Sequence, residues 1–242
     1  MEDRFYDPEY ISKLFDRMGP TYDVINLVSS FGFSEFWRYQ CVSHLPIHPG
    51  AVVCDMMAGS GECWPHIARR TGASGHLLSV DFCNTMVERQ NKRNSKVDAK
   101  ITVLHQNALC TSIPSESVDF VVAAFGLKTL GTNDLSKFAV EICRVLKPGG
   151  MFSLIEISVP QSAMLNFAYM LYIRRVIPLV GRLFLGDIAA YRMLGDYTLS
   201  FGSCERVKAT FELPQFNIEL RRHFFGCTTA LVGKKTQESC SI

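Results

Sequence analysis

The feature that most restricts the fold of this chain is a short apolar strand that runs directly into a glycine turn. It reads Val52-Val53-Cys54-Asp55-Met56-Met57-Ala58-Gly59-Ser60-Gly61-Glu62. Asp81 ends the next apolar run, and Asn107 follows the run after that. Asp55, Asp81 and Asn107 are successively 26 positions apart, so each falls at an equivalent strand end. Because ligands of open α/β sheets bind at that edge, the pattern predicts a nucleoside site there.

Apolar runs of strand length alternate with segments of helix length along the chain. The runs cover 51–56, 77–80, 101–104, 118–124 and 151–157, and the segments cover 62–71, 84–94 and 133–147. This alternation predicts right-handed βαβ units and a mainly parallel sheet with helices on both faces. Leu146–Gly150 is expected to turn from the last of these helices into its strand. Residues 218–225 and 228–232 predict a closing hairpin, which adds an antiparallel edge. We therefore expect an α/β, Rossmann-like doubly wound sheet of seven strands.

The domain organisation follows from length and from breaks in this rhythm. With 242 residues, 48% of them apolar, the chain can bury a full core. Asp7 and Pro8 predict a helix over 7–18, and a second helix carries Phe36 to Leu45. We expect a single domain over 1–242, made of an N-terminal helical cover (1–48), cofactor-binding βα units (49–158), a helical lid insertion (159–202), a closing helix and hairpin (203–234) and a tail (235–242).

Composition excludes several classes of function. The 25 basic and 23 acidic residues include no long basic run, so nucleic acid is not an expected partner. Nine cysteines without a CxxC pair, and no signal peptide, favour a reducing, cytoplasmic setting without a metal site. The most apolar stretch, 163–186, contains Arg174, Arg175 and Arg182, which argues against a spanning helix. A lid helix or a peripheral membrane contact stays open, and so does a homodimer.

The glycine turn favours an adenosine ligand without phosphates. A dinucleotide fingerprint would need a glycine at position 64, where this chain has Trp64. Asp81 is expected to accept hydrogen bonds from ribose hydroxyls, and Asn107 suits an adenine edge. S-adenosylmethionine has this adenosine and adds a charged amino-acid end. In the same site we place Asp55 near the ammonium group, the turn Gly59, Ser60 and Gly61 along the amino-acid end, and Met57 and Phe82 on the ring faces.

Motifs spread over about residues 14 to 233 match a known family. They are Phe15-Asp16, Tyr22–Asn26, Phe31-Gly32, Trp37, Asp55–Gly61, Asp81, Asn107-Ala108, Phe125–Leu127, Leu146–Gly150, Glu156, Pro178, Gly181, Asp187, Tyr191-Arg192 and Leu194. The chain resembles a class I S-adenosylmethionine-dependent methyltransferase, and more narrowly the ubiquinone/menaquinone-biosynthesis C-methyltransferases. The resemblance implies contacts to S-adenosylmethionine from Ser60, Asp81, Asn107 and Ala108. Ala124 stands where the family commonly has serine, so one polar contact is expected to be missing.

The chain departs from that family where the methyl acceptor should bind. The family's FGLRN reads Phe125-Gly126-Leu127-Lys128-Thr129, its His-Arg pair becomes Ser34-Glu35, and a serine becomes Tyr197. Lysine lacks the planar guanidinium with which arginine forms paired hydrogen bonds, and threonine lacks the amide group that donates and accepts hydrogen bonds in asparagine. We therefore expect the same reaction with a different acceptor, namely a hydrophobic, aromatic or prenylated small molecule methylated at carbon, nitrogen or oxygen.

Three residues are candidates for catalysis. Lys128 would be a base if burial depresses its pKa, and Glu156 would orient an acceptor hydroxyl or amine. Tyr22 would hydrogen-bond the acceptor or close over the methionine end. Alternatively, Lys128 is an exposed lysine at a strand end, Glu156 caps the following helix, and Tyr22 packs in the N-terminal cover. The residues expected to contact the acceptor are Phe33, Phe125, Thr129, Tyr169, Tyr191 and Arg192. A phospholipid head-group N-methyltransferase, and a non-methylating binding or pericyclase-like protein on the same fold, are the alternative functions.

Overall fold

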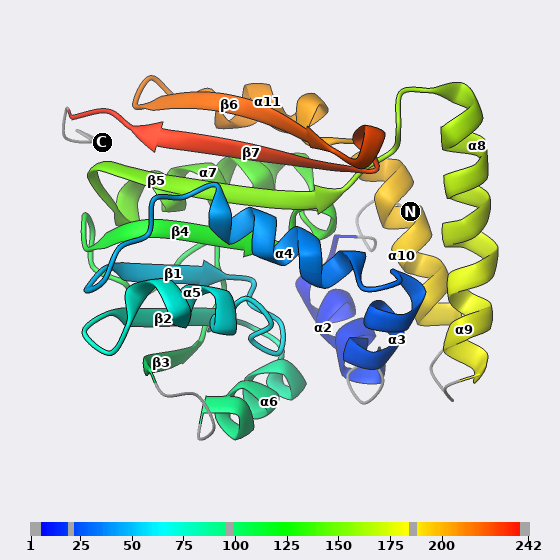
Figure 1. The fold of residues 1–242 in the computed structure, drawn as a ribbon, viewed down its shortest axis with the longest axis horizontal. Helices are drawn as coiled ribbons and strands as arrows, with labels where there is room; N and C mark the ends of the chain where they lie inside the picture. Colours follow the sequence, from blue (N-terminus) through cyan, green and yellow to red (C-terminus); the bar gives the residue numbers. More distant parts are fainter. Residues whose placement is uncertain (1–5, 19–21, 95–98, 184–187, 238–242) are drawn as a thin grey trace.

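The structure is a computed structural model that describes residues 6–18, 22–94, 99–183 and 188–237. These residues form a seven-stranded sheet in the order β3-β2-β1-β4-β5-β7-β6 (Figure 1). Strands β1 to β5 pair in parallel, and β7 runs antiparallel to both β5 and β6. The predicted Rossmann-like fold is therefore confirmed. The strands are β1 Val52–Met56, β2 His76–Asp81, β3 Lys100–His105, β4 Val118–Ala124, β5 Leu146–Ile157, β6 Phe216–His223 and β7 Thr228–Lys235.

Helices cover both faces of the sheet. On one face lie α4 (Phe33–Ser43) and α5 (Trp64–Thr71), and on the other lie α7 (Thr132–Val145) and α11 (Cys204–Phe211). Successive residues of a strand point to opposite faces. Val53 accordingly packs with the side chains of α4 and α5, whereas Cys54 packs with those of α7 and α11. This double burial explains the nearly continuous apolar runs of the central strands.

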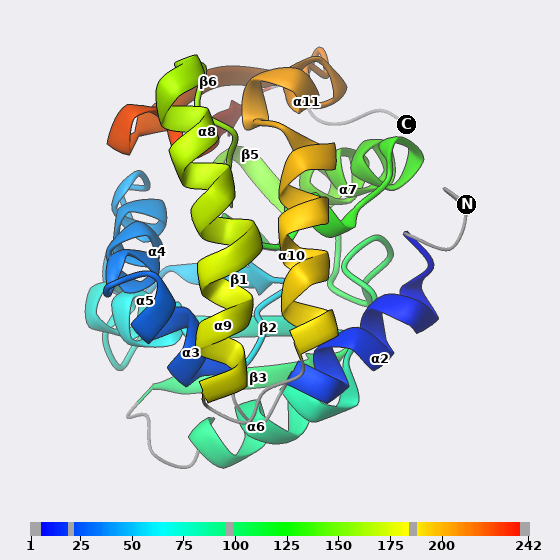
Figure 2. The ribbon, with the colours of Figure 1, turned by 90° about the vertical axis from the view of Figure 1, so that its right-hand side faces the viewer.

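A third layer of helices lies at the carboxyl ends of the parallel strands (Figures 1 and 2). Buried side chains of α2 pack there with Met86 of α6 and Tyr197 of α10. A π-helical turn, Tyr172–Val176, joins α8 to α9 just before Pro178, which cannot donate a helical hydrogen bond. The helices of this layer are α2 Pro8–Met18, α3 Tyr22–Ser29, α8 Ala163–Leu171, α9 Ile177–Leu183 and α10 Ile188–Phe201. Helix α6 (Asn84–Asn94) connects β2 to β3 and contacts both β3 and α2. Two short 3₁₀ helices, η1 (Leu127–Thr129) and η3 (Phe224–Gly226), complete the described elements.

Strand β5 begins earlier than expected. Residues 146–150, predicted as a turn, are already strand, and Leu146 pairs with Val118 before the register shifts. The start of β5 is held by Lys235, a fully buried residue of β7. Its ammonium donates hydrogen bonds to the carbonyl oxygens of Leu146 and Cys143 and to Glu116. Sequence alone did not indicate this contact, because its partners lie about 90 or more positions away. The separate helix α3 was not expected either.

We predict that Lys235→Met lowers the free energy of unfolding by about 3 kcal/mol, because two buried carbonyl oxygens lose their donor. Urea denaturation monitored by circular dichroism measures this change. Lys234→Met is the matched control, since Lys234 is exposed and its replacement should alter stability by less than about 0.5 kcal/mol. Equal midpoints for the two variants would contradict the role of Lys235.

Candidate functional site

A cleft opens at the carboxyl ends of β1, β2 and β4, beneath α2. This strand-end cleft encloses about 1000 Å³ of empty space, including its open mouth. Residues predicted to bind a cofactor line it, and these are Asp55, Met57, Gly59, Asp81, Phe82, Asn107, Ala108 and Ala124. Ser60 and Gly61 belong to the same turn but do not line the cleft, and Ser60 is buried. The even spacing of strand ends has therefore brought most of the predicted set together.

The glycine turn is fixed by the tryptophan that follows it. Gly61 has a φ of 83°, and a Cβ at this position would lie 2.6 Å from the Trp64 ring, so only glycine fits. The Trp64 ring nitrogen donates to Ser79 Oγ, which donates to Gln90 Oε1. The Gln90 amide in turn donates to the carbonyl oxygen of Gly59 at 2.7 Å. This chain of hydrogen bonds ties the turn to β2 and α6, which gives the cleft a rigid floor.

Asp81 ends β2 and reaches across to the glycine turn. Its Oδ2 accepts the backbone N–H of Gly59 at 2.8 Å, and its Oδ1 accepts that of Cys83 at 2.9 Å. Burial raises the pKa of Asp81 to about 6, and the charge of Glu62 adds to this, although three backbone donors, Phe82 among them, oppose it. A carboxylate has about four acceptor positions, so Asp81 can also accept a ligand hydroxyl.

Asp55 is buried and lacks a partner at one oxygen. Its side chain lines the cleft and is 1% exposed, and its Oδ2 accepts no hydrogen bond from the residues that the structure describes. Burial, followed by the charges of Glu62 and Asp81, holds its pKa well above the usual range. A buried, unsatisfied carboxylate is unfavourable unless a donor or a cation meets it. This oxygen is therefore available to a donor or a cation that enters the cleft.

Arg38 is a cleft residue that the sequence reasoning missed. It extends from α4, lines the cleft and is 7% exposed. Its guanidinium donates to Glu62 Oε1 at 3.2 Å and lies 5.3 Å from the ring centroid of Phe125. Its position directly after Trp37, the last residue of a recognised motif, was the available signal. Other lining residues missed in this way come from the turn and from the N-terminal region, namely Glu62, Tyr6, Ile11 and Phe15.

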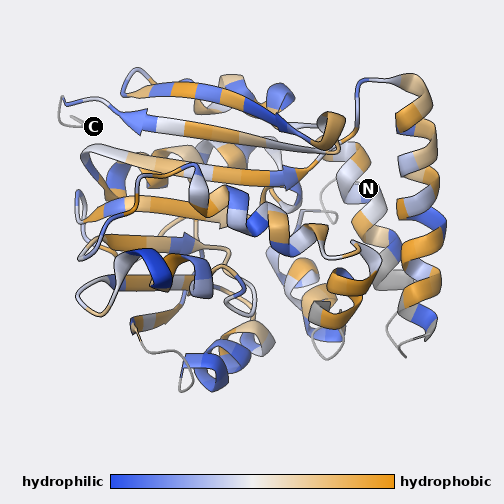
Figure 3. Cartoon of the chain, in the orientation of Figure 1, coloured by the Kyte–Doolittle hydropathy of each residue, from blue (hydrophilic) through white to orange (hydrophobic). Residues whose placement is uncertain are grey.

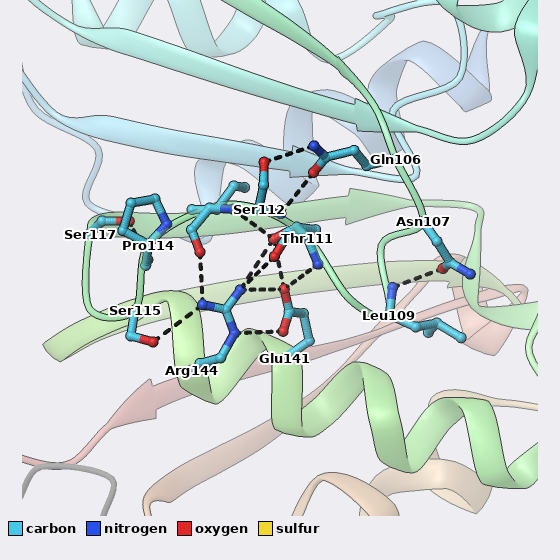
Figure 4. Close-up of polar contacts among 11 residues, drawn as sticks. Gln106, Asn107, Leu109, Thr111, Ser112, Pro114, Ser115, Ser117, Glu141 and Arg144 are labelled. Carbon is cyan, nitrogen blue, oxygen red and sulfur yellow. Dashed lines mark hydrogen bonds and ion pairs between the residues drawn. The ribbon is translucent and has the colours of Figure 1, made fainter.

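The loop that carries Asn107 and Ala108 is anchored from α7 (Figure 4). Asn107 Oδ1 accepts the backbone N–H of Leu109, which turns the chain after β3. Glu141 accepts hydrogen bonds from the backbone and hydroxyl of Thr111, and Arg144 donates to the carbonyl oxygen of Thr111. Arg144 and Glu141 also form an ion pair at 2.7 Å. Glu141 and Arg144 thus keep one wall of the cleft in place, although neither of them lines the cleft.

On the acceptor side, Phe125 and Thr129 line the cleft but Lys128 and Glu156 do not. Phe125 has a left-handed backbone with φ of 68°. The ammonium of Lys128 donates to the Phe125 carbonyl oxygen at 2.5 Å and to Glu156 Oε1 at 2.9 Å. Glu156 Oε2 also accepts the backbone N–H of Lys128. The side chains of Lys128 and Glu156 are buried and point at each other. Lys128 is therefore neither the exposed lysine nor the cleft-facing base that the sequence suggested.

The other predicted acceptor residues lie outside the cleft or outside the described side chains. Phe33 packs on Phe224, with ring centroids 4.7 Å apart. The Tyr169 hydroxyl donates to the carbonyl oxygen of Cys227, and Arg192 lines a separate groove between α8 and α10. Tyr22 and Tyr191 lie in α3 and α10, but their side chains are outside the part of the chain that the structure describes.

Comparison with known proteins agrees with this geometry. A sequence model of the ubiE/COQ5 methyltransferase family matches residues 4–235. The ubiquinone/menaquinone biosynthesis C-methyltransferase of Geotalea daltonii is 33% identical and covers 94% of this chain and 97% of its own length. The demethylmenaquinone methyltransferase of Lactiplantibacillus plantarum is 29% identical and covers 93% and 95%. A solved S-adenosylmethionine-dependent methyltransferase of Aquifex aeolicus shares the fold, with a TM-score of 0.59 and 17% identity over 82% of this chain and 89% of its own.

The raised pKa of Asp81 predicts a pH-dependent affinity. A pKa of about 6 means that the folded protein takes up this proton at a higher pH than the unfolded chain does. Protonation therefore favours the free protein and opposes a ligand that needs the carboxylate. We expect the affinity for S-adenosylhomocysteine, measured by calorimetry, to fall by up to about tenfold per unit as the pH drops below 6. Asp81→Asn should flatten this dependence, and an unchanged affinity on either side of pH 6 would contradict the assignment.

Proposed function

Because the chain belongs to the ubiE/COQ5 methyltransferase family and is an S-adenosylmethionine-dependent methyltransferase, we propose that it methylates a ring carbon of a hydrophobic, quinone-like aromatic acceptor. The observation that carries this proposal is the mixed chemistry of the strand-end cleft. Its lining includes Asp55, Glu62 and Asp81, which lie near one another and which we call the acidic end, and apolar side chains of α2 and of the loop after β4, which we call the apolar end.

The acidic end suits S-adenosylmethionine. Asp81 would hold the ribose hydroxyls, and Asn107 would meet the adenine edge. Asp55 would receive the ammonium group, and Arg38 beside it would meet the carboxylate of the methionine portion. When bound, this cofactor supplies a methyl group on a positively charged sulfur, open to in-line displacement. The residues of the chain then have to exclude water and align the acceptor, and alignment lowers barriers by up to roughly 7–11 kcal/mol in well-oriented systems.

The apolar end suits a flat, hydrophobic acceptor. Ile11 and Phe15 of α2 and Leu130 after η1 line it together with Phe125. Thr129 is the polar group among the altered acceptor-side positions that lines the cleft, and its hydroxyl donates to the carbonyl oxygen of Gly126 at 2.7 Å. One hydroxyl in an apolar wall can accept a single hydrogen bond from a ring substituent. This supports an acceptor with fewer polar groups than the family's arginine and asparagine could hydrogen-bond at these positions.

We infer that Lys128 and Glu156 position the acceptor wall rather than move protons. Their ion pair is buried, and Lys128 also bonds the carbonyl oxygen of Phe125, whose left-handed backbone turns its ring toward Arg38. A left-handed conformation is unfavourable for an aromatic residue and persists where surrounding contacts hold it. The pair therefore fixes the ring that faces the acceptor.

The function is tested with methyl-labelled S-adenosylmethionine and a reduced, demethylated naphthoquinone carrying a short prenyl tail. We expect mass spectrometry to find the label on a ring carbon, with S-adenosylhomocysteine formed in equal amount. Asp81→Ala should abolish cofactor binding, whereas Glu219→Gln on the distant strand β6 should not. The proposal would be overturned if the label appeared only in added phospholipid. It would also be overturned if the protein bound the cofactor but methylated no aromatic acceptor.

A second prediction separates positioning from proton transfer at Lys128. Lys128→Met leaves the Glu156 carboxylate buried without its cation, so we expect about 3–5 kcal/mol lower stability and a loss of activity. Adding Glu156→Gln removes that charge and should recover most of the stability and a large part of the single-turnover rate. If stability returns while the rate stays at background, Lys128 acts in the chemistry and the positioning role is wrong.

A further inference from the structure

The outer side of the helical layer, where α8 and α9 face the viewer in Figure 2, carries several exposed apolar side chains. Met164 and Phe167 of α8, Phe31 after α3 and Phe225 of η3 are each 75% or more exposed. Stacking of Phe31 on Tyr172, with ring centroids 6.2 Å apart, links the loop after α3 to the end of α8. We call this surface the outer lid face and define it by Phe31, Met164, Phe167, Leu171, Leu179 and Phe225. Isolated exposed apolar residues are ordinary, but a group of them on elements that contact one another indicates an interaction surface.

Two of these phenylalanines are held in an unfavourable backbone. Phe31 has a φ of 51° and Phe225 a φ of 55°. Bulky residues rarely adopt this left-handed region, whereas glycine or asparagine would do so readily. Both side chains remain largely exposed, so the ring contacts of Phe31 with Tyr172 and of Phe225 with Phe224 bury little of them in return for the strain. Strain combined with exposure indicates that the aromatic side chains serve a contact outside the protein.

Arginines outnumber carboxylates beside the outer lid face, where Asp196 lines the groove next to Arg174, Arg175 and Arg192. Residues 157–186 contain Arg174, Arg175 and Arg182 and no acidic residue. Arg174, Arg175 and Arg192 line a groove between α8 and α10 together with Phe167 and Leu171. Arg174 pairs with Asp196, whereas Arg175 and Arg192 form no ion pair with the residues that the structure describes. An apolar surface edged by uncompensated arginines is complementary to a layer of acyl chains beneath anionic head groups.

The apolar helix lies on the protein rather than crossing a bilayer. Among the described residues, the stretch Ala163–Val180 is long and apolar enough to span a membrane by length and composition only (Figure 3). Met170 and Ile173 are nevertheless buried against the domain. The hydroxyl of Tyr169 donates to the carbonyl oxygen of Cys227, and that of Tyr172 to the carbonyl oxygen of Ser29. These contacts hold one side of the helix to the fold and leave the opposite side exposed.

We propose that the outer lid face docks on the surface of an anionic phospholipid bilayer. The phenylalanines enter the acyl region, and Arg174, Arg175 and Arg192 meet lipid phosphates, as in other interfacial helices. The face lies close to the strand-end cleft, because α9 and α2 contribute side chains to the same hydrophobic cluster and α2 supplies a wall of the cleft. Docking would place that wall beside the lipid phase. The proposal stands on surface chemistry, so it holds or fails independently of which acceptor is methylated.

The test is flotation of the full chain with vesicles of phosphatidylcholine alone or mixed with phosphatidylglycerol. We expect binding to the anionic vesicles, weakened by salt. Arg175→Gln should lower the vesicle affinity about fivefold, the effect of one cation at such a surface. Phe167→Ser and Phe225→Asn should each lower it about tenfold or more, as expected for withdrawing an aromatic side chain from lipid.

Matched controls separate docking from damage to the fold. Arg69→Gln on α5 removes the same charge, and Val140→Ser on α7 removes an exposed apolar side chain, and both should bind vesicles like the wild type. The Tm of Phe225→Asn should stay level or rise, because asparagine tolerates the left-handed backbone. Calorimetric affinity for S-adenosylhomocysteine should be unchanged in every lid variant.

Three results would overturn the proposal. One is a wild-type protein that does not float with anionic vesicles. Another is equal vesicle binding by Arg175→Gln, Phe167→Ser and their controls. The third is a dimer in light scattering that Phe167→Ser dissociates and that binds no vesicle, which would make a second copy of the chain the occupant of this face.

Discussion

The carboxylate of Asp81 joins the parts of the strand-end cleft. It accepts backbone hydrogen bonds from the glycine turn after β1 and from Cys83 at the start of α6, so three segments meet at one side chain. The path from Trp64 through Gln90 to Gly59 adds a second tie between the same segments. Because these contacts exist before any ligand arrives, binding does not have to order the turn, and less of the interaction energy is lost to conformational entropy.

This arrangement concentrates negative charge in a buried place. Asp55, Glu62 and Asp81 lie near one another, and Arg38 is the cation paired with Glu62. Burial raises the pKa of Asp55 and of Asp81, and the neighbouring carboxylates raise both further. The raised pKa values reflect burial and the repulsion among these carboxylates in the free protein. A ligand carrying a sulfonium and an ammonium group would relieve it in the complex, so the instability of the empty cleft favours a cationic ligand.

Sequence patterns located the cleft better than they located the acceptor side. Asp55, Asp81 and Asn107 follow from strand length and from the regular rhythm of βα units, which depend on neighbouring residues in the chain. Lys128 was assigned by its position in a motif, yet its ammonium turns away from the cleft toward Glu156, 28 positions later. Arg192 likewise matches a motif but lies in the groove beside α8. Helix packing decides such directions, and motif spacing does not contain that information.

By itself, the sequence determined the sheet, the glycine turn and the strand-end residues of the cleft. Its apolar periodicity and its glycines restrict the backbone locally, whatever the rest of the chain does. Tertiary structure alone decided that Arg38 enters the cleft, that Lys128 and Glu156 neutralise each other, and that the phenylalanines of the outer lid face stay in solvent. Each of these outcomes depends on contacts between segments far apart in the chain. A buried charged side chain pairs with the partner that the fold brings within reach, because the free-energy cost of leaving its charge unpaired exceeds that of an unfavourable local conformation.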